Sequence, residues 1–182
     1  MVSHCAIFFA EAFQDGVGGS SPVNRSRFAT TAYGRLRILE RYRRIAMVGL
    51  SSNPFRPSHF AAVYLIAEGY DVIPVNPREP VILGRKSYPS LGTIPGSIEV
   101  VDIFREPAAV PPIVEEAIAI GARVVWMQLG VIHEAAADHA RAAGLEVVMD
   151  RCMKIEHARF FGGLNTIGMN TSVISSRRRL RP

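Results

Sequence analysis

The apolar run Ile45-Ala46-Met47-Val48-Gly49-Leu50 stops abruptly at Ser51-Ser52-Asn53-Pro54. A run this short is typical of a parallel strand that is covered on both faces, since a buried helix is usually longer. Residues 58–68 follow with apolar side chains at helical spacing. Ser58 is expected to cap this helix, and Gly69 is expected to end it. The segment therefore predicts a strand, a turn and a helix in succession.

The same alternation continues to residue 149. Helices are predicted at 33–44, at about 110–120 and at about 134–143, and further strands at 71–75, 99–104, 123–128 and 145–149. Strands and helices that alternate with short connections form a parallel sheet, and right-handed crossovers place helices on both of its faces. The predicted fold class is α/β, a doubly wound, mostly parallel, five-stranded Rossmann-like sheet in a single domain.

Length and composition bound the class of protein. The chain has 182 residues, of which 48% are hydrophobic and 20% are charged, as in one globular domain. No apolar run reaches the length of a membrane span, and two cysteines are too few for a disulfide framework. We therefore expect a cytoplasmic protein that has no contact with a membrane. Apolar segments near the ends of the chain allow a homodimer.

Charge divides the chain into three parts. The formal net charge is +5, yet residues 45–160 carry more acidic than basic side chains, so the basic character belongs to the ends. We expect residues 1–32 to be a leader that is looped or disordered, 33–160 to be the domain, and 161–182 to be a basic tail. Because this basic cluster is short, nucleic acid is disfavoured as a partner.

The loop after the first strand has the features of an anion site. In doubly wound folds, ligands bind beyond the carboxyl ends of the strands. Gly49 permits a sharp turn, and the helix that follows directs its N–H groups and its positive end toward the ligand. Arg56 is suited to phosphate, and the hydroxyl groups of Ser51 and Ser58 are suited more weakly. The loop predicts a diphosphate site, and the alternative is a simple turn with a solvated arginine.

The end of the second strand bears on the choice of nucleotide. The loop lacks the three glycines of a dinucleotide fingerprint, and Val75-Asn76-Pro77-Arg78 offers no carboxylate for a ribose diol. These features disfavour NAD. Arg78 is suited to an extra ribose phosphate, as found in NADP or in coenzyme A. The missing glycines favour coenzyme A.

The later strand ends are less specific. Phe104 and Arg105 either flank an adenine or a pantetheine arm, or serve the core and the surface. Gln128 is expected in the cleft and not in the core. Cys152, between basic neighbours and near His157, is either a reactive thiolate or a half-buried inert thiol, and the inert state is favoured. No spacing of ligands predicts a metal site.

Six segments together resemble a known family: 45–51, 56–58, 73–77, 101–105, 126–130 and 148–152. In order and spacing they are similar to small stand-alone CoA-binding proteins, which resemble the CoA-binding Rossmann-like domain of the succinyl-CoA synthetase alpha subunit. The resemblance covers about residues 35–160. The phosphorylated histidine of that synthetase belongs to a second domain, so the resemblance does not imply ligase chemistry.

The resemblance implies a ligand, coenzyme A or an acyl-CoA, and it implies the residues that bind this ligand. The diphosphate would lie by Gly49, Ser51, Asn53, Arg56 and Ser58, the ribose phosphate by Val75, Asn76, Pro77 and Arg78, and the rest of the ligand by Phe104, Arg105 and Gln128.

Three functions follow as hypotheses. The first is a non-catalytic protein that binds CoA or acyl-CoA. The second is a small NADP-linked oxidoreductase or a CoA-thioester transferase, which is disfavoured because no acid/base pair is recognisable at the strand ends. The third is a regulatory interaction module that acts through the basic tail. We therefore expect a binding protein and not an enzyme.

Overall fold

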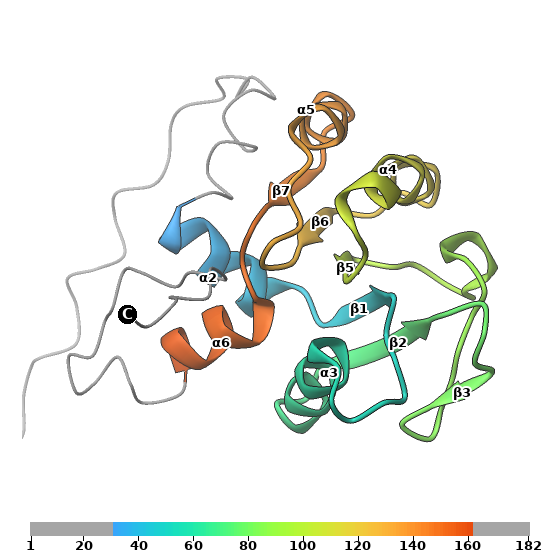
Figure 1. Cartoon of the computed structure of the whole chain (residues 1–182). Helices are drawn as coiled ribbons and strands as arrows, with labels where there is room; N and C mark the ends of the chain where they lie inside the picture. The colour runs from blue at the N-terminus through green and yellow to red at the C-terminus, as the bar shows by residue number, and fades with distance from the viewer. Residues whose placement is uncertain (1–30, 162–182) are drawn as a thin grey trace, which may run out of the picture.

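Five parallel strands form the centre of the molecule in the computed structural model, which describes residues 31–161 (Figure 1). Their order across the sheet is β2-β1-β5-β6-β7. The strands are β1 (Arg44–Val48), β2 (Asp71–Val75), β5 (Val100–Ile103), β6 (Val124–Met127) and β7 (Glu146–Val148). β1 pairs with β2 from Arg44↔Asp71 to Val48↔Val75, and with β5 on its other side. This order confirms the predicted fold class.

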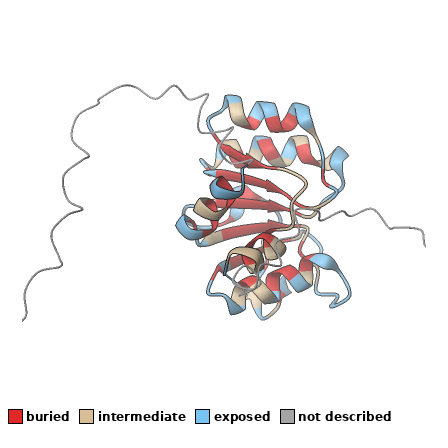
Figure 2. Cartoon of the chain, turned by 90° about the vertical axis from the view of Figure 1, so that its left-hand side faces the viewer, coloured by how far each residue is buried: buried red, intermediate tan, exposed pale blue. Residues whose placement is uncertain are grey.

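Helices cover both faces of the sheet. The helices are α2 (Ala32–Arg41), α3 (Pro57–Ala67), α4 (Val110–Ala119), α5 (Glu134–Ala142) and α6 (Met153–Phe161). Buried side chains of α4 and α5 pack on one face, and those of α2, α3 and α6 pack on the other. The strands are accordingly buried along most of their length, except at Arg44 and Asp71, the first residues of β1 and β2, while each helix is buried along one side only (Figure 2).

The two faces of the sheet alternate along each strand, as strand geometry requires. In β1, Ile45 and Met47 belong to the α2–α3–α6 face, and Ala46 and Val48 belong to the α4–α5 face. Both sets are apolar because both faces are covered by helices. The continuous apolar run in the sequence has this physical cause.

Several boundaries differ from the sequence prediction. Helix α3 begins at Pro57 and is capped by Arg56, so Ser58 lies in its first turn and the predicted cap is wrong. Proline is favoured at the first helical position because its fixed φ suits the helix. Gly69, with φ of +85°, does follow the end of α3 as predicted. Two features were not predicted, helix α6 and the small antiparallel hairpin of β3 (Val81–Ile82) and β4 (Arg85–Lys86).

Short 3-10 turns complete the fold, η1 (Leu91–Thr93) before β5 and η2 (Pro107–Ala109) before α4. The predicted leader and the predicted tail lie outside the described residues, apart from their innermost positions. Within residues 31–161, every helix is too short or too polar to cross a membrane.

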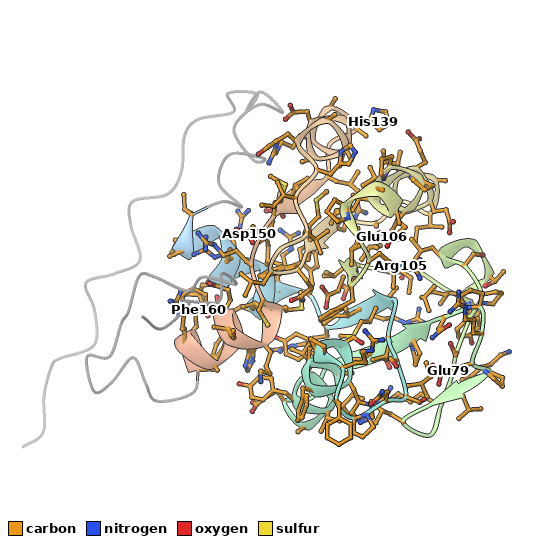
Figure 3. The ribbon with its side chains drawn as sticks, viewed as in Figure 1. Glu79, Arg105, Glu106, His139, Asp150 and Phe160 are labelled. Atoms are coloured by element: carbon orange, nitrogen blue, oxygen red, sulfur yellow. The ribbon has the colours of Figure 1, made fainter. Side chains whose placement is uncertain are left out.

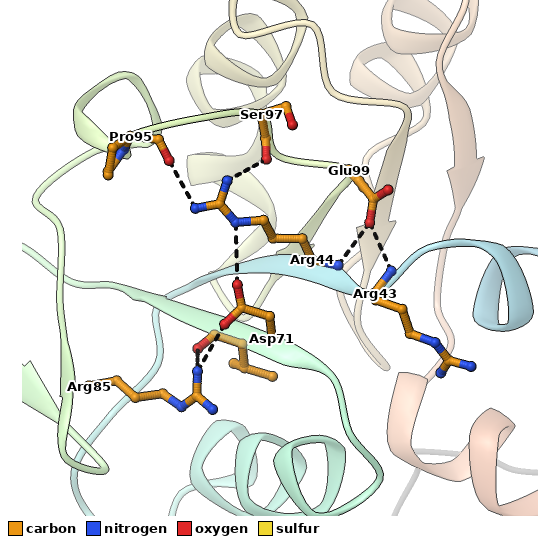
Figure 4. A network of polar contacts seen from close by, with 8 residues as sticks. Arg43, Arg44, Asp71, Arg85, Pro95, Ser97 and Glu99 are labelled. Carbon is orange, nitrogen blue, oxygen red and sulfur yellow. Dashed lines mark hydrogen bonds and ion pairs between the residues drawn. The ribbon is translucent and has the colours of Figure 1, made fainter.

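A polar network joins the amino ends of three strands (Figure 4). Asp71 bonds the guanidinium groups of Arg44 and Arg85 at 3.3 and 3.0 Å. Glu99 accepts the backbone N–H groups of Arg43 and Arg44 at 2.8 and 2.9 Å. A hollow of about 270 Å³ lies beside the ion pairs, and another of about 320 Å³ borders Glu99. The first hollow extends along the outer edge of β2 and the second lies at the amino ends of the strands, so neither lies beyond the carboxyl ends, where a doubly wound sheet binds its ligand.

Candidate functional site

The point where the strand order reverses lies between β1 and β5. The chain passes from β1 outward to β2 and then returns to β5 on the other side of β1. In open parallel sheets the ligand site lies at such a point, beyond the carboxyl ends. The loops that follow β1 and β5 are therefore the structural candidates.

Gly49 brings these two loops into contact. Its φ is +87°, and a Cβ atom placed there would lie 2.6 Å from the Phe104 carbonyl oxygen and 2.9 Å from Arg105 Cδ. Its backbone N–H donates to the Val75 carbonyl at 2.9 Å. Only glycine satisfies both the left-handed conformation and the close approach. Two predicted site residues, Gly49 and Arg105, are thus brought together from separate segments.

Three predicted side chains build the loop itself. Ser58 Oγ accepts the N–H of Ser51 at 3.3 Å, and Ser51 Oγ accepts the N–H of Asn53 at 3.2 Å. Asn53 Oδ1 accepts the N–H of Phe55 at 2.9 Å. Each group acts here as an acceptor, so both serine hydroxyls retain a hydrogen that can be donated to an anion. Their contact with a ligand stays a prediction.

Arg56 stands at the entrance to α3. It is the N-cap residue of that helix, its side chain makes no capping bond, and it is exposed to solvent. The neighbouring Phe55 is 87% exposed. The positive end of α3 and the Arg56 guanidinium thus lie at the carboxyl edge of the sheet, where an anionic ligand would be favoured.

Asn76 fastens the end of β2 to the loop after β1. Its Nδ2 donates to the Leu50 carbonyl at 2.9 Å and to Glu79 Oε1 at 3.1 Å, and its Oδ1 accepts the N–H of Arg78 at 2.9 Å. Both amide hydrogens are therefore used within the protein. Asn76 therefore positions the site, and only the one remaining lone pair of its Oδ1 is left to accept a hydrogen bond from a ligand.

Glu79 corrects one step of the sequence argument, which found no carboxylate near the end of β2. Its Oε1 also lies 3.5 Å from the N–H of Ser52, so a carboxylate does approach the loop after β1 (Figure 3). Sequence reasoning missed Glu79 because it stands three residues beyond Asn76. The contact shows that the loop presents a donor to negative charge, and it weakens the sequence-based case against a nucleotide with a ribose diol.

The other predicted residues after β2 differ in exposure. Val75 is 4% exposed and belongs to the core, so its predicted contact with a ligand finds no support. Pro77 and Arg78 are exposed at the surface. Arg78 is therefore open to a phosphate, as the sequence predicts.

Phe104 and Arg105 follow β5 and have different surroundings. Phe104 is half-buried and packs against the core on the α2–α3–α6 face. Arg105 is half-exposed and lies beside Glu106, with Nη2 3.8 Å from Oε1 (Figure 3). The core alternative therefore holds for Phe104, while Arg105 lies at the edge that would receive the ligand.

Gln128 lies inside the protein, and the expectation that it would be open to a cleft is wrong. It is 3% exposed, and its Nε2 donates to Asp102 Oδ1 at 2.7 Å. Asp102 is fully buried in β5, and burial raises the pKa of this carboxyl to about 7 although the bond from Gln128 lowers it. A polar residue was expected in solvent, but a second buried polar group provides its partner.

Among the described residues, Asp102 Oδ2 is the one buried side-chain oxygen or nitrogen without a hydrogen-bond partner. Sequence reasoning did not single out this residue, although a carboxylate inside the run Val100-Val101-Asp102-Ile103 is a visible signal. Buried acids are rare unless they are paired, so an incompletely paired one is a candidate for function.

Cys152 is a half-buried free thiol, as the favoured interpretation expected, and the choice between an inert and a reactive thiol stays a prediction. Burial and the nearby Asp102 raise its pKa, whereas the backbone N–H groups of Ile155 and Lys154 lower it. The net direction is upward, so a thiolate stabilised by basic neighbours is not found. His157 Nδ1 lies 3.0 Å from the Tyr64 hydroxyl, and burial lowers the pKa of this imidazole. The side chain at hydrogen-bond distance from His157 Nδ1 is thus a tyrosine and not the Cys152 thiol.

Other groups add little chemistry. His133 caps α5, where its Nδ1 accepts the N–H of Ala136 at 3.1 Å. No group of three or more metal-ligating side chains occurs in the part of the chain that the structure describes. The carboxyl edge of the sheet therefore offers anion-binding groups, while β5 and the segment after β7 add one buried carboxyl and one half-buried thiol.

Comparison with known proteins shows the family. The family model described as CoA binding domain matches residues 43–158. The protein YneT of Bacillus subtilis (strain 168) is 41% identical over 121 residues, which cover 66% of this chain and 90% of that protein. The residues that the family model matches include every predicted site position.

Solved structures agree in fold. A hypothetical protein from Pyrococcus horikoshii OT3 is 45% identical with a TM-score of 0.70, and the match covers 72% of this chain and 93% of that one. A dinucleotide-forming acetyl-coenzyme A synthetase from Ca. Korarchaeum cryptofilum is 21% identical with a TM-score of 0.53, and it covers 58% of this chain and 26% of that chain. The latter likeness concerns the fold alone. The expected resemblance to small CoA-binding domain proteins is confirmed.

Proposed function

The chain belongs to the CoA-binding domain family, and from this premise we propose that it binds coenzyme A or an acyl-CoA as a carrier or sensor, without multiple-turnover catalysis. The observation that carries the proposal is the junction of the loops after β1 and β5 at Gly49, which lies beyond the carboxyl end of the sheet where the strand order reverses.

The charges at this edge suit the ligand. Arg56, Arg78 and Arg105 lie at or near the surface on three loops that follow β1, β2 and β5. CoA carries a diphosphate and a ribose phosphate, and guanidinium groups bind phosphate through paired, charge-assisted hydrogen bonds. The start of α3 adds its positive end. Three separated cations match a ligand with more than one phosphate group.

The experiment is calorimetric titration of the protein with CoA, acetyl-CoA, NAD, NADP and ATP. We expect CoA or acetyl-CoA to bind most tightly. Arg56→Ala should weaken CoA binding by roughly 1.5–3 kcal/mol because a charge-assisted contact is lost. Arg141→Ala is the matched control, since Arg141 lies on α5 and pairs with the exposed Asp138. Binding of NAD or NADP in preference to CoA would contradict the proposal and favour the oxidoreductase.

A cytoplasmic location and a homodimer formed through apolar segments near the ends of the chain stay predictions. Size-exclusion chromatography with light scattering tests the second.

A further inference from the structure

We propose that Cys152 and Asp102 form a thiol–carboxyl pair that accepts the acyl group of a bound acyl-CoA. The inference rests on the proposed function, and it deepens it by making the carrier a covalent one. The ligand class is an acyl thioester.

Sheet geometry places the carboxyl of Asp102 on the same face as helix α6. Asp102 is in register with Met47 of β1 and with Trp126 of β6, and both of these neighbours belong to the α2–α3–α6 face. Side chains in register on neighbouring strands of a parallel sheet point to the same face. Phe104, two residues farther along, packs on that face as well.

The segment that carries Cys152 crosses this same face. Trp126 Nε1 donates to the Arg151 carbonyl at 2.7 Å, and Met153 is buried in the cluster that contains Trp126. Cys152 lies between these two anchored residues, directly before α6. Because Asp102 is in register with Trp126, and the Trp126 indole bonds the residue before Cys152, Cys152 and Asp102 are brought to the same face of the sheet.

The two residues differ in burial, and this difference assigns them different roles in the transfer. Cys152 is half-buried and Asp102 is fully buried, so we assign the attack on the thioester to the sulfur and not to the carboxylate. The Asp102 oxygen that does not bind Gln128 has no hydrogen-bond partner among the described residues. A half-buried thiol with a raised pKa needs a base before it can attack a carbonyl, and we assign that role to this oxygen, an unpaired acceptor on the same face of the sheet.

The chemical step balances without an oxidant. The thiol proton passes to Asp102 Oδ2 as the Cys152 sulfur attacks the thioester carbonyl carbon. The tetrahedral intermediate collapses when the bond between that carbon and the CoA sulfur breaks, and Asp102 returns the proton to the departing CoA thiolate. The products are an acyl thioester on Cys152 and free CoA. One thioester replaces another, so the free energy changes little and the transfer is reversible.

The test uses the full chain and acetyl-CoA. Protein is mixed with excess acetyl-CoA, quenched in acid and weighed intact, and the adduct is located by digestion. We expect one acetyl group on Cys152, removable by hydroxylamine as a thioester is. Asp102→Asn should slow its formation roughly 100-fold, the effect typical of a lost general base. The matched control is Cys5→Ala, which changes the other cysteine of the chain and should react like the unmodified protein.

Calorimetry on the same samples separates this inference from the proposed function. Cys152→Ala should still bind CoA while it gains no acetyl group. A protein that binds acetyl-CoA but stays unmodified, or an adduct that persists in Cys152→Ala, would overturn the acyl acceptor and leave CoA binding standing. An adduct formed from CoA disulfide and not from acetyl-CoA would also overturn it, in favour of disulfide exchange. Absence of any CoA binding would instead refute the proposed function.

Discussion

A single methyl group at residue 49 should disrupt the site more than the same group elsewhere. Gly49→Ala would place Cβ 2.6 Å from the Phe104 carbonyl and force a left-handed conformation on alanine. Gly69 is a matched control, because its φ is +85° and nothing lies within 4 Å of the added atom. We expect Gly69→Ala to cost about 1–2 kcal/mol and Gly49→Ala roughly 2–5 kcal/mol of unfolding free energy in urea titration. Equal losses would show that the contact between the loops is soft.

Asp102 should make stability fall as the pH rises. Burial raises the folded-state pKa to about 7 from an ordinary value of 3.8. Between pH ~4 and pH ~7 the folded protein therefore keeps a proton that the unfolded chain has lost. The contribution of Asp102 to the free energy of unfolding is greatest below pH ~4, declines up to pH ~7 and is constant above. The decline amounts to about 4 kcal/mol at most.

Asp102→Asn tests this decline, since asparagine has the same shape and does not titrate. We expect urea unfolding between pH 5 and pH 8 to show the loss in the unmodified protein and not in the variant. His157 acts in the opposite direction, because burial lowers its pKa and its contribution to stability is lost as the pH falls. It is present in both proteins, so it cancels in the comparison. A parallel pH dependence of the two proteins would contradict the assignment.

At the scale of the elements, prediction from sequence succeeded where the pattern has a single physical cause. The strands of the sheet are mostly apolar because two layers of helices cover them, and short apolar runs of this kind are typical of parallel strands. Helix α6 was missed because its nine residues mix charged and apolar side chains. One of those charges, Glu156, is buried and bonds Arg35 at 2.8 Å, a long-range ion pair that no local pattern reveals.

The residues of the candidate site were likewise predicted where their roles are local and missed where they are not. The loop after β1 was predicted because its glycine, serines and arginine have local roles in turns and helix starts. Gln128, Asp102 and Glu79 were misplaced or missed because their partners come from other strands and loops. Sequence patterns can place a residue at a strand end, but they cannot show whether its side chain turns inward or toward solvent.

The segment after β2 should determine which form of the ligand binds. Arg78 is exposed there while Asn76 holds its backbone. We expect dephospho-CoA, which lacks the ribose 3′-phosphate, to bind more weakly than CoA, and Arg78→Ala to remove that difference. Competition titration measures both affinities. Lys86→Ala is the control, because Lys86 is exposed nearby but lies over the Tyr88 ring at 5.0 Å. Equal affinity of the two ligands for the unmodified chain would contradict this role.

At the scale of the whole molecule, a basic cluster and the elements of the candidate site occupy different parts of the chain. Arg177, Arg178, Arg179 and Arg181 gather near the end of the chain, outside the residues that match the CoA-binding family. The elements that build the candidate site all lie within 44–161. If the basic residues served a regulatory partner, the ligand site would not need them. If they steered the anionic ligand, CoA affinity would depend on them and would fall with salt.

We expect the ligand site not to depend on these arginines. Replacing the four arginines by serine should leave the CoA affinity at ~0.1 M salt within about twofold, because these residues lie outside the segment that matches the family and the Debye length at that salt is only ~10 Å. A chain of residues 31–161 should bind equally well, because it keeps the sheet, both helical layers and all three loop arginines. Calorimetry at two salt concentrations measures both variants against the full chain. If the serine variant alone loses affinity, and loses it most at low salt, the basic residues steer the ligand. If the shortened chain alone loses affinity, residues outside 31–161 contribute to the fold or to the site by contacts other than charge.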